Sequence, residues 1–198
     1  LLKHVGADRA FVGGSSAGAR TSMLFYLRHP EMVRGLLLMR VTGGAFAAGR
    51  LPDNYYGNFI KAAREGGMAA VCATEQYQER IAANPRNRDY LMKMDVNHYI
   101  QVMSRWMDQF KSGGHLPVMG VTDAQLASIK VPTVLIPGND NTHSSVSGRY
   151  AASKIPGCVL HELPVKDVDI ALIPYPDWAP YEPEICRVFV AHMKRVGG

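Results

Sequence analysis

The sequence predicts an α/β fold in which a mostly parallel sheet is interrupted by a helical insertion. Three observations indicate this class: a strand, a helix and a strand follow one another near the start, a long central stretch has only helical spacing, and strand-like apolar runs return after residue 130. The chain has 198 residues, of which 47% are hydrophobic, and no run of eighteen apolar residues. This composition excludes a disordered tail and a membrane-spanning helix.

The first forty residues predict a βαβ unit. Residues 10–14 form a short apolar run that ends in glycines, as expected for a buried parallel strand. Residues 17–29 have apolar side chains at helical spacing and stop at His29-Pro30. Residues 33–39 form a second apolar strand. Two parallel strands joined by a helix imply a right-handed crossover.

The middle of the chain predicts a helical insertion, and the end predicts the rest of the sheet. Helices are expected over residues 55–65, 68–82 and 96–111, with breaks at Gly66-Gly67, Pro85 and Gly113-Gly114. Strands are then expected over 131–138 and 159–163, and helices over 146–154 and 182–195. The predicted organisation is therefore a core over residues 1–45, a helical cap over 46–128 and the remaining core over 129–198.

Charge and cysteine content exclude several functions. The formal charge is +5, but the excess near the front consists of single arginines rather than a cluster, which is not the pattern of a nucleic-acid binder. Cys72, Cys158 and Cys186 lie far apart and lack the spacing of a zinc or redox site. The start has no apolar region of signal-peptide length, and we expect reduced thiols in a cytoplasmic protein with no membrane role.

The motif that carries chemistry is Gly14-Ser15-Ser16-Ala17-Gly18, which fits the pattern G-x-S-x-G. It follows a predicted strand directly and opens a predicted helix, so that Ser16 is expected at a strained turn with its Oγ exposed. Small residues two positions on either side are expected to let the strand and helix approach closely. The Ala17 N–H, at the helix N-terminus, is a candidate donor to a developing oxyanion.

In these residues the sequence resembles the α/β-hydrolase superfamily. The resemblance runs over residues 6–18, Arg28-His29-Pro30-Glu31 and Leu36-Leu37-Leu38, and returns over residues 129–140, which look like the family strand that precedes the catalytic acid. The helical insertion lies where that family has its cap domain. The resemblance implies a Ser–His–acid triad with Ser16 as nucleophile, and no metal or organic cofactor.

The acid and the histidine depart from the family pattern. Asp140 is close to the acid position, although the usual spacing could place Asn141 there. The loop after Leu163-Pro164, which should carry the histidine, contains none. The remaining candidates for the base are His143, His161 and His192.

We hypothesise that His143 is the general base. It follows Asp140 by three residues, in a loop expected at the carboxyl edge of the sheet, where α/β folds collect functional groups. Its carboxylate partner is Asp140, or alternatively Asp167 or Asp169 from the loop that normally supplies the histidine. By contrast, His161 is expected to be packed or at a sheet edge, and His192 is expected on the surface of the last helix.

Candidate substrate contacts lie in the cap and beside the second strand. Tyr55, Tyr56 and Trp106 are expected to line an apolar pocket, although aromatic residues at helical spacing more often form a cap's own core. Arg40 and Arg50 could bind a substrate carboxylate, but solvated arginines are the favoured interpretation.

The expected function is hydrolysis of an ester, lactone, amide or related acyl bond of a small, partly apolar substrate through a Ser16 acyl-enzyme. The alternatives are carbon–carbon hydrolysis or a lyase reaction on the same fold, and a degenerate, non-catalytic small-molecule receptor. In the family the nucleophile lies well inside the chain, whereas here it is residue 16. An N-terminal segment of the fold is therefore expected, as a separate chain or as residues outside this sequence; the alternative is a homo-oligomer formed through the bare sheet edge.

Overall fold

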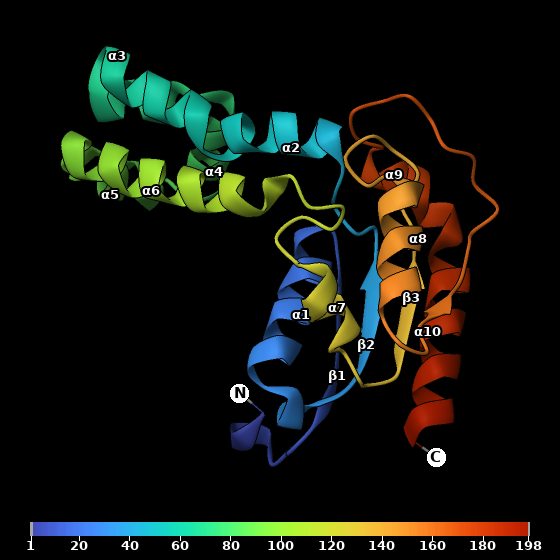
Figure 1. Cartoon of the computed structure of the whole chain (residues 1–198). Helices are drawn as coiled ribbons and strands as arrows, with labels where there is room; N and C mark the ends of the chain where they lie inside the picture. The colour runs from blue at the N-terminus through green and yellow to red at the C-terminus, as the bar shows by residue number, and fades with distance from the viewer. Residues whose placement is uncertain (1, 198) are drawn as a thin grey trace. The chain divides into compact units, whose positions relative to one another are not determined.

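The computed structural model describes residues 2–197 and divides the chain into two compact units (Figure 1). The first unit contains the residues up to Ala47 together with those from Gly113 onward, and the second is Ala48–Ser112. The cap was predicted over residues 46–128, so the structure gives residues 113–128 to the first unit. There α7 (Asp123–Ala127) begins at a capping box between Thr122 and Gln125.

The first unit is built on a four-stranded, fully parallel sheet in the order β1-β2-β3-β4. The strands are β1 (Ala10–Ser15), β2 (Val33–Met39), β3 (Thr133–Ile136) and β4 (Val159–Leu160). The α/β class with a parallel sheet and a helical insertion is confirmed. The strand predicted over 159–163 is shorter than expected, because the chain leaves the sheet after His161 N donates to Leu135 O.

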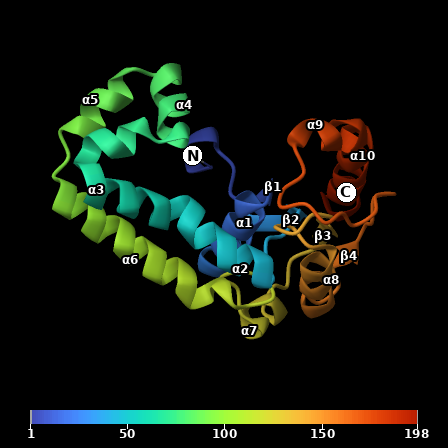
Figure 2. The ribbon, with the colours of Figure 1, turned by 90° about the horizontal axis from the view of Figure 1, so that it is seen from above.

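Alternate residues of the central strands face two different cores. Leu36, Leu38 and Leu135 pack with α1 (Ala17–Arg28), α7 and α8 (Ser145–Lys154) on one face. The other face, with Met39 and Ile136, packs against Trp178 and the C-terminal helix. The elements there are α9 (Tyr175–Trp178), η4 (Ala179–Tyr181) and α10 (Glu182–Gly197). Figure 2 shows α8 and α10 on opposite sides of β3. Both faces of the sheet are thus covered, as parallel sheets require.

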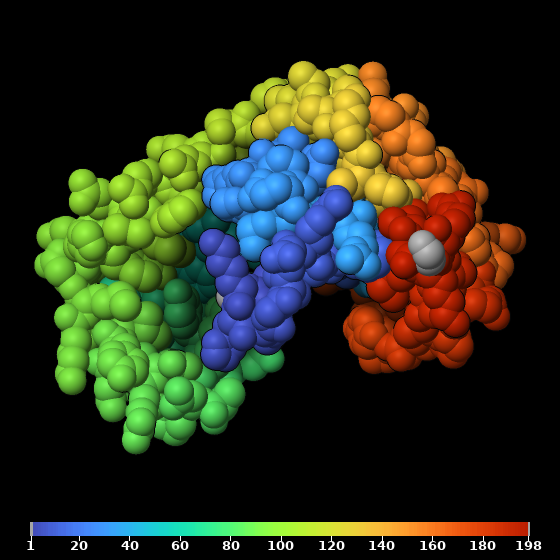
Figure 3. Space-filling model, turned by 90° about the horizontal axis from the view of Figure 1, so that it is seen from below, coloured from blue at the N-terminus to red at the C-terminus, as the bar shows by residue number. Residues whose placement is uncertain are grey.

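Among residues 2–197, no strand pairs with the outer edge of β1, so this edge of the sheet is open. A groove of about 580 Å³ lies against it and is lined by Phe11, Val12 and Phe25, among other residues. In the space-filling view from below, the dark blue segment that contains β1 lies at the surface (Figure 3). Short helical turns, η1 (Lys3–Val5) and η2 (Pro30–Met32), precede β1 and β2.

The second unit is helical, as predicted for a cap. Its elements are α2 (Ala45–Pro52, which begins in the first unit), η3 (Asp53–Gly57), α3 (Asn58–Ala73), α4 (Glu75–Ala83), α5 (Arg86–Met92) and α6 (Val96–Gly114). The helix α3 is kinked at Gly66 and Gly67, where a break was expected. Phe59, Val71 and Tyr99 belong to a hydrophobic core of this unit's own. Across the described residues 2–197, no helix is long and apolar enough to span a membrane.

Candidate active site

Ser16 occupies the sharp turn between β1 and α1. Its backbone has φ 57° and ψ −120°, a combination that residues with a side chain rarely adopt. The turn is held by Ser16 N, which donates to Met39 O at 3.1 Å, and by Ser16 O, which accepts from Ala19 N at 3.1 Å. The strained turn therefore presents the hydroxyl at the carboxyl end of the strands, as the motif predicted.

The glycines of this motif differ in what they require. A Cβ at Gly14 would lie 2.6 Å from the Gly18 carbonyl carbon, so close approach of strand and helix demands glycine there. A Cβ at Gly18, by contrast, would meet no described atom within 4 Å. The expectation of crowding at both positions is thus wrong for Gly18, because Gly18 lines the open groove beside β1.

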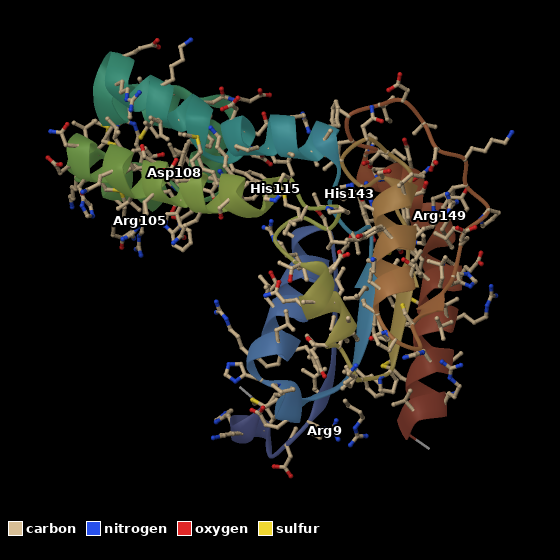
Figure 4. The ribbon with its side chains drawn as sticks, viewed as in Figure 1. Arg9, Arg105, Asp108, His115, His143 and Arg149 are labelled. Atoms are coloured by element: carbon tan, nitrogen blue, oxygen red, sulfur yellow. The ribbon has the colours of Figure 1, made fainter. Side chains whose placement is uncertain are left out.

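His143 lies in the loop between β3 and α8, next to Ser16. Its Nε2 is 2.8 Å from Ser16 Oγ, and the residue is only 3% exposed. Figure 4 shows His143 near the start of α8, close to the ends of β2 and β3. A parallel bridge between Gly43 and His143 holds the loop to the segment after β2. A Cβ at Gly138 would overlap His143 O, so the loop also packs tightly on itself.

Asp140 binds the far side of the His143 ring. The His143 Nδ1 lies 3.0 Å from Asp140 Oδ1, which also accepts from His143 N at 2.7 Å. The other oxygen, Oδ2, accepts from Ile173 N at 3.0 Å and from Arg40 Nη2 at 2.7 Å. Burial favours the neutral carboxyl, but the hydrogen bonds from His143 and Ile173 outweigh it, so the pKa of Asp140 lies below its ordinary value. Asp140 is therefore an ionised, fully hydrogen-bonded carboxylate.

Arg40 is a buried member of this cluster, and the expectation that it is solvated is wrong. It follows β2 directly, has φ 51° and is 6% exposed. Its guanidinium carbon lies 4.8 Å from the centre of the Trp178 ring. Sequence reasoning could not place it because Trp178 and Ile173 come from the far end of the chain. The sequence alone also does not reveal that the backbone of Arg40 has a positive φ.

The alternative acids have other partners. Asp167 Oδ2 accepts from Ser145 Oγ at 2.7 Å, and Asp169 Oδ1 accepts from Asn141 Nδ2 at 2.8 Å. The Asn141 side chain, the second candidate for the acid position, is thus turned to Asp169. The loop that carries both aspartates nevertheless supports the site, since Asn141 N donates to Ile170 O at 3.0 Å.

The other two candidate histidines are bonded elsewhere. His161 Nε2 lies 2.8 Å from Glu184 Oε1, between the end of β4 and α10. His192 is 4% exposed, so its expected surface position is wrong, and burial lowers its pKa. Its Nδ1 lies 3.0 Å from an Arg195 nitrogen. Neither imidazole has a hydrogen bond to Ser16 in the described part of the chain.

The predicted pocket residues all lie in the second unit. Tyr55, Tyr56 and Phe110 form a cluster of aromatic rings whose centres are 5.8 to 6.4 Å apart. Tyr55 and Trp106 are 45% and 49% exposed, so their rings are not fully absorbed into the core of that unit. Their place as substrate contacts stays a prediction.

One further polar group lies beside Ser16, and the sequence analysis did not single it out. The Thr42 hydroxyl is 3.4 Å from Ser16 Oγ, and Thr42 is 7% exposed. Its position shortly after the second predicted strand, at the carboxyl end of the sheet, could have indicated that Thr42 lies near Ser16. Between residues 2 and 197, no group of three or more His, Cys, Asp or Glu side chains could hold a metal ion, and the three cysteines are free thiols.

Comparisons with known proteins identify the fold. No protein-family model matches the chain, and no curated protein matches it. Solved structures do match, among them an enol-lactonase from Burkholderia xenovorans LB400, with 18% identity and a TM-score of 0.53 over 98% of this chain and 68% of the other. The α/β hydrolase MGS-M2 from a Medee basin deep-sea metagenome has 17% identity and a TM-score of 0.51 over 100% and 68%.

A third match extends the range of relatives to an archaeon. The structure comes from a study of carboxylesterases of Nitrososphaera gargenis and has 15% identity and a TM-score of 0.54 over 99% of this chain and 68% of the other. At such identities the likeness is one of fold. The chain therefore has the α/β-hydrolase fold, and it spans about 68% of the length of these matched chains.

Proposed function

We propose that the chain carries the active site of a serine hydrolase that cleaves an ester, lactone, amide or related acyl bond of a small, partly apolar substrate. The observation that carries the proposal is the hydrogen-bonded series Ser16 Oγ–His143 Nε2 at 2.8 Å and His143 Nδ1–Asp140 Oδ1 at 3.0 Å. A nucleophile, a base and an acid that orients the base are what covalent acyl transfer needs. The lactonase and carboxylesterases among the structural matches support the choice of ester and lactone bonds.

In the proposed reaction, Ser16 Oγ attacks the acyl carbonyl as its proton passes to His143 Nε2. The carbonyl electron pair moves to oxygen, and we expect the N–H of Ala17, the first residue of α1, to donate to that oxyanion, since the first N–H groups of a helix lack an intrahelical acceptor. His143 then returns the proton to the leaving alcohol or amine, and the acyl–oxygen bond to Ser16 remains. A water molecule then attacks the acyl carbon as its proton passes to His143 Nε2. The bond from the acyl carbon to Ser16 Oγ breaks, His143 gives the proton to Oγ, and the carboxylic acid leaves, while Asp140 accepts from the Nδ1–H throughout.

We also propose that the open edge of β1 accepts a further parallel strand from the rest of the α/β-hydrolase fold. The groove of about 580 Å³ there exposes apolar side chains, and long apolar edges of parallel sheets are not left in water. Acyl transfer commonly uses two oxyanion donors, and a neighbouring strand would bring the second. A homo-oligomer formed through the same edge is the competing occupant, and the molecular mass in solution by light scattering distinguishes the two.

A fluorophosphonate probe tests the proposed function, because it phosphonylates only an activated serine. We expect wild type to be labelled in one position and Ser16→Ala to remain unlabelled. Ser15→Ala is the matched control, since Ser15 is the neighbouring hydroxyl in the same turn, and it should keep the label on Ser16, as located by peptide mass spectrometry. Absence of labelling in wild type would contradict the proposal and favour a non-catalytic receptor.

A carbon–carbon hydrolase would use the same serine, so labelling alone does not exclude it. A panel of short p-nitrophenyl esters and lactones makes the distinction. We expect the wild-type protein to hydrolyse these substrates, with higher turnover rates for shorter acyl chains. We expect this turnover to be lost in Ser16→Ala. Labelling of Ser16 without turnover of any acyl substrate would instead favour the carbon–carbon reaction or a lyase.

A further inference from the structure

Arg40 touches both the acid and the base of the proposed triad. Its Nη2 lies 2.7 Å from Asp140 Oδ2 and 3.3 Å from His143 Nδ1, and 3.4 Å from Ile173 O. The ion pair is buried, with side-chain exposures of 7% for Arg40 and 0% for Asp140. Because both side chains are buried, solvent screens this pair far less than a surface ion pair, whose effect would be small.

We propose that Arg40 is a positioning residue that offsets the charge of Asp140, so that His143 stays a neutral base; the proposal rests on the function proposed above. A buried carboxylate against Nδ1 favours the imidazolium form, and a ring that is already protonated cannot take the Ser16 proton. The positive charge of Arg40 offsets the negative charge of Asp140, so the two groups beside His143 Nδ1 have almost no net charge. His143 then gains its proton only when Ser16 attacks.

Within residues 2–197, the charged and polar groups that contact the His143 ring come from three segments of the chain. Asp140 precedes it in the same loop, Arg40 comes from the segment after β2, and Ser16 faces the opposite nitrogen. The segment after β4 contributes the Ile173 amide to Asp140, while its aspartates bind Ser145 and Asn141 instead. Arg40 and Asp140 are therefore the charged groups with contacts to the ring among the residues described.

The way Arg40 is held fits this role. Its backbone N donates to Ile136 O at 2.9 Å although its φ is positive, so the strained residue is tied to β3. The guanidinium plane is covered by the Trp178 ring, and Trp178 Nε1 donates to Asn139 Oδ1 at 3.2 Å in the acid loop. All three polar contacts of the Arg40 side chain are made by Nη2, so Arg40 does not bind Asp140 in a bidentate manner. The position of its positive charge is therefore what should affect His143. A lysine should therefore preserve part of the effect.

The test is the pH at which the His143 ring takes up a proton, followed by NMR of its ring C–H signals and assigned with His143→Gln. In Arg40→Met we expect this midpoint to move to higher pH by about one unit or more, the size typical of an adjacent charge. In Arg40→Lys it should move by less than half as much. Arg149→Met, which removes an arginine ion-paired to Glu162 at the surface, is the control and should leave the midpoint unchanged.

An unchanged or lower midpoint in Arg40→Met would overturn the proposal. If Arg40→Met does not fold, the pair Asp140→Asn and Asp140→Asn/Arg40→Met replaces it, since no buried carboxylate is then left without its cation. Loss of Arg40 should raise the midpoint there as well, and no difference would equally overturn the proposal. The NMR titration needs no turnover, so its result is independent of the fluorophosphonate labelling. Unlabelled Ser16 would contradict the proposed hydrolase function, whereas an unchanged titration midpoint of His143 would contradict only the proposed role of Arg40.

Discussion

The Nε2 atom of His143 lies 2.8 Å from Ser16 Oγ, although 127 positions separate the two residues in the chain. The same imidazole is bonded to Asp140, three residues before it. One loop therefore supplies both the base and the acid of the proposed triad. In the superfamily that the sequence resembles, the histidine is expected after the last strand instead. Here that later segment carries Ile173, whose backbone N–H donates to Asp140 Oδ2.

Replacement of the acid should impair activity far more than it impairs folding. In Asp140→Asn the amide cannot stabilise a protonated His143, and the ring can adopt the wrong tautomer. We expect kcat to fall by about 10³-fold or more, by analogy with the loss of the acid in other serine triads. The rates of ester hydrolysis of Asp140→Asn and of Asp169→Asn provide the measurement. A comparable loss in Asp169→Asn would point to Asp169 as the acid instead.

The same carboxylate should make the fold sensitive to acid. Burial opposes ionisation of Asp140, but the bonds from His143 and Ile173 prevail and hold its pKa below the ordinary value. A group with a lowered folded pKa stabilises the protein fully above its unfolded pKa of about 4. That contribution is lost as the pH falls from there toward the folded pKa.

We therefore expect the free energy of unfolding of wild type to fall by about 2 kcal/mol more than that of Asp140→Asn between about pH 5 and pH 2. Urea denaturation at each pH gives the values. Asp108→Asn, at an exposed position of α6 (Figure 4), is the control and should follow wild type. Parallel curves for wild type and Asp140→Asn would contradict an ionised, stabilising Asp140.

Replacement of Gly138 should strain the loop that carries His143. A Cβ at Gly138 would overlap both the O and the Cβ of His143. We expect Gly138→Ala to lower the free energy of unfolding by about 2 kcal/mol and to slow phosphonylation of Ser16, since the imidazole must move. In Gly49→Ala the new methyl group meets open space within helix α2, so that variant should be up to about 1 kcal/mol more stable. Equal stabilities of the two variants would contradict the packing described here.

The strain at Ser16 should be measurable once the hydroxyl is gone. With φ 57° and ψ −120°, the turn suits glycine better than any residue with a Cβ. We expect Ser16→Gly to be about 1 kcal/mol more stable than Ser16→Ala, although both lack the nucleophile. At Ser153, inside the helix α8, the order should reverse by about the same amount. The same order at both positions would show that Ser16 is not strained.

The parts of the fold that local sequence determines were predictable. The strand–turn–helix around Ser16 needs only an apolar run, a glycine and a helix start, all within about ten residues, and β1, α1 and β2 lie where they were expected. The kink at Gly66 and Gly67 follows from the same kind of local signal. The fold class followed from the order of these elements.

What the sequence could not predict depends on distant packing. Arg40 is buried because Trp178 covers it and Asp140 binds it, and both residues lie a hundred or more positions farther along the chain. His192 reads as a surface residue of an amphipathic helix, yet it is buried because that helix packs against the central strands. Such long-range burial leaves no periodic signal in the residues themselves.

The assignment of His143 as the base is tested by the rate at which a fluorophosphonate modifies Ser16 in three single variants, His143→Gln, His161→Gln and His192→Gln, with folding checked by circular dichroism. His143→Gln should lose at least about 10³-fold of the rate, because only its ring lies within hydrogen-bonding distance of Ser16 Oγ among the described histidines. The other two variants should react within about threefold of wild type. A folded His143→Gln that reacts at the wild-type rate would show that His143 is not the base that activates Ser16.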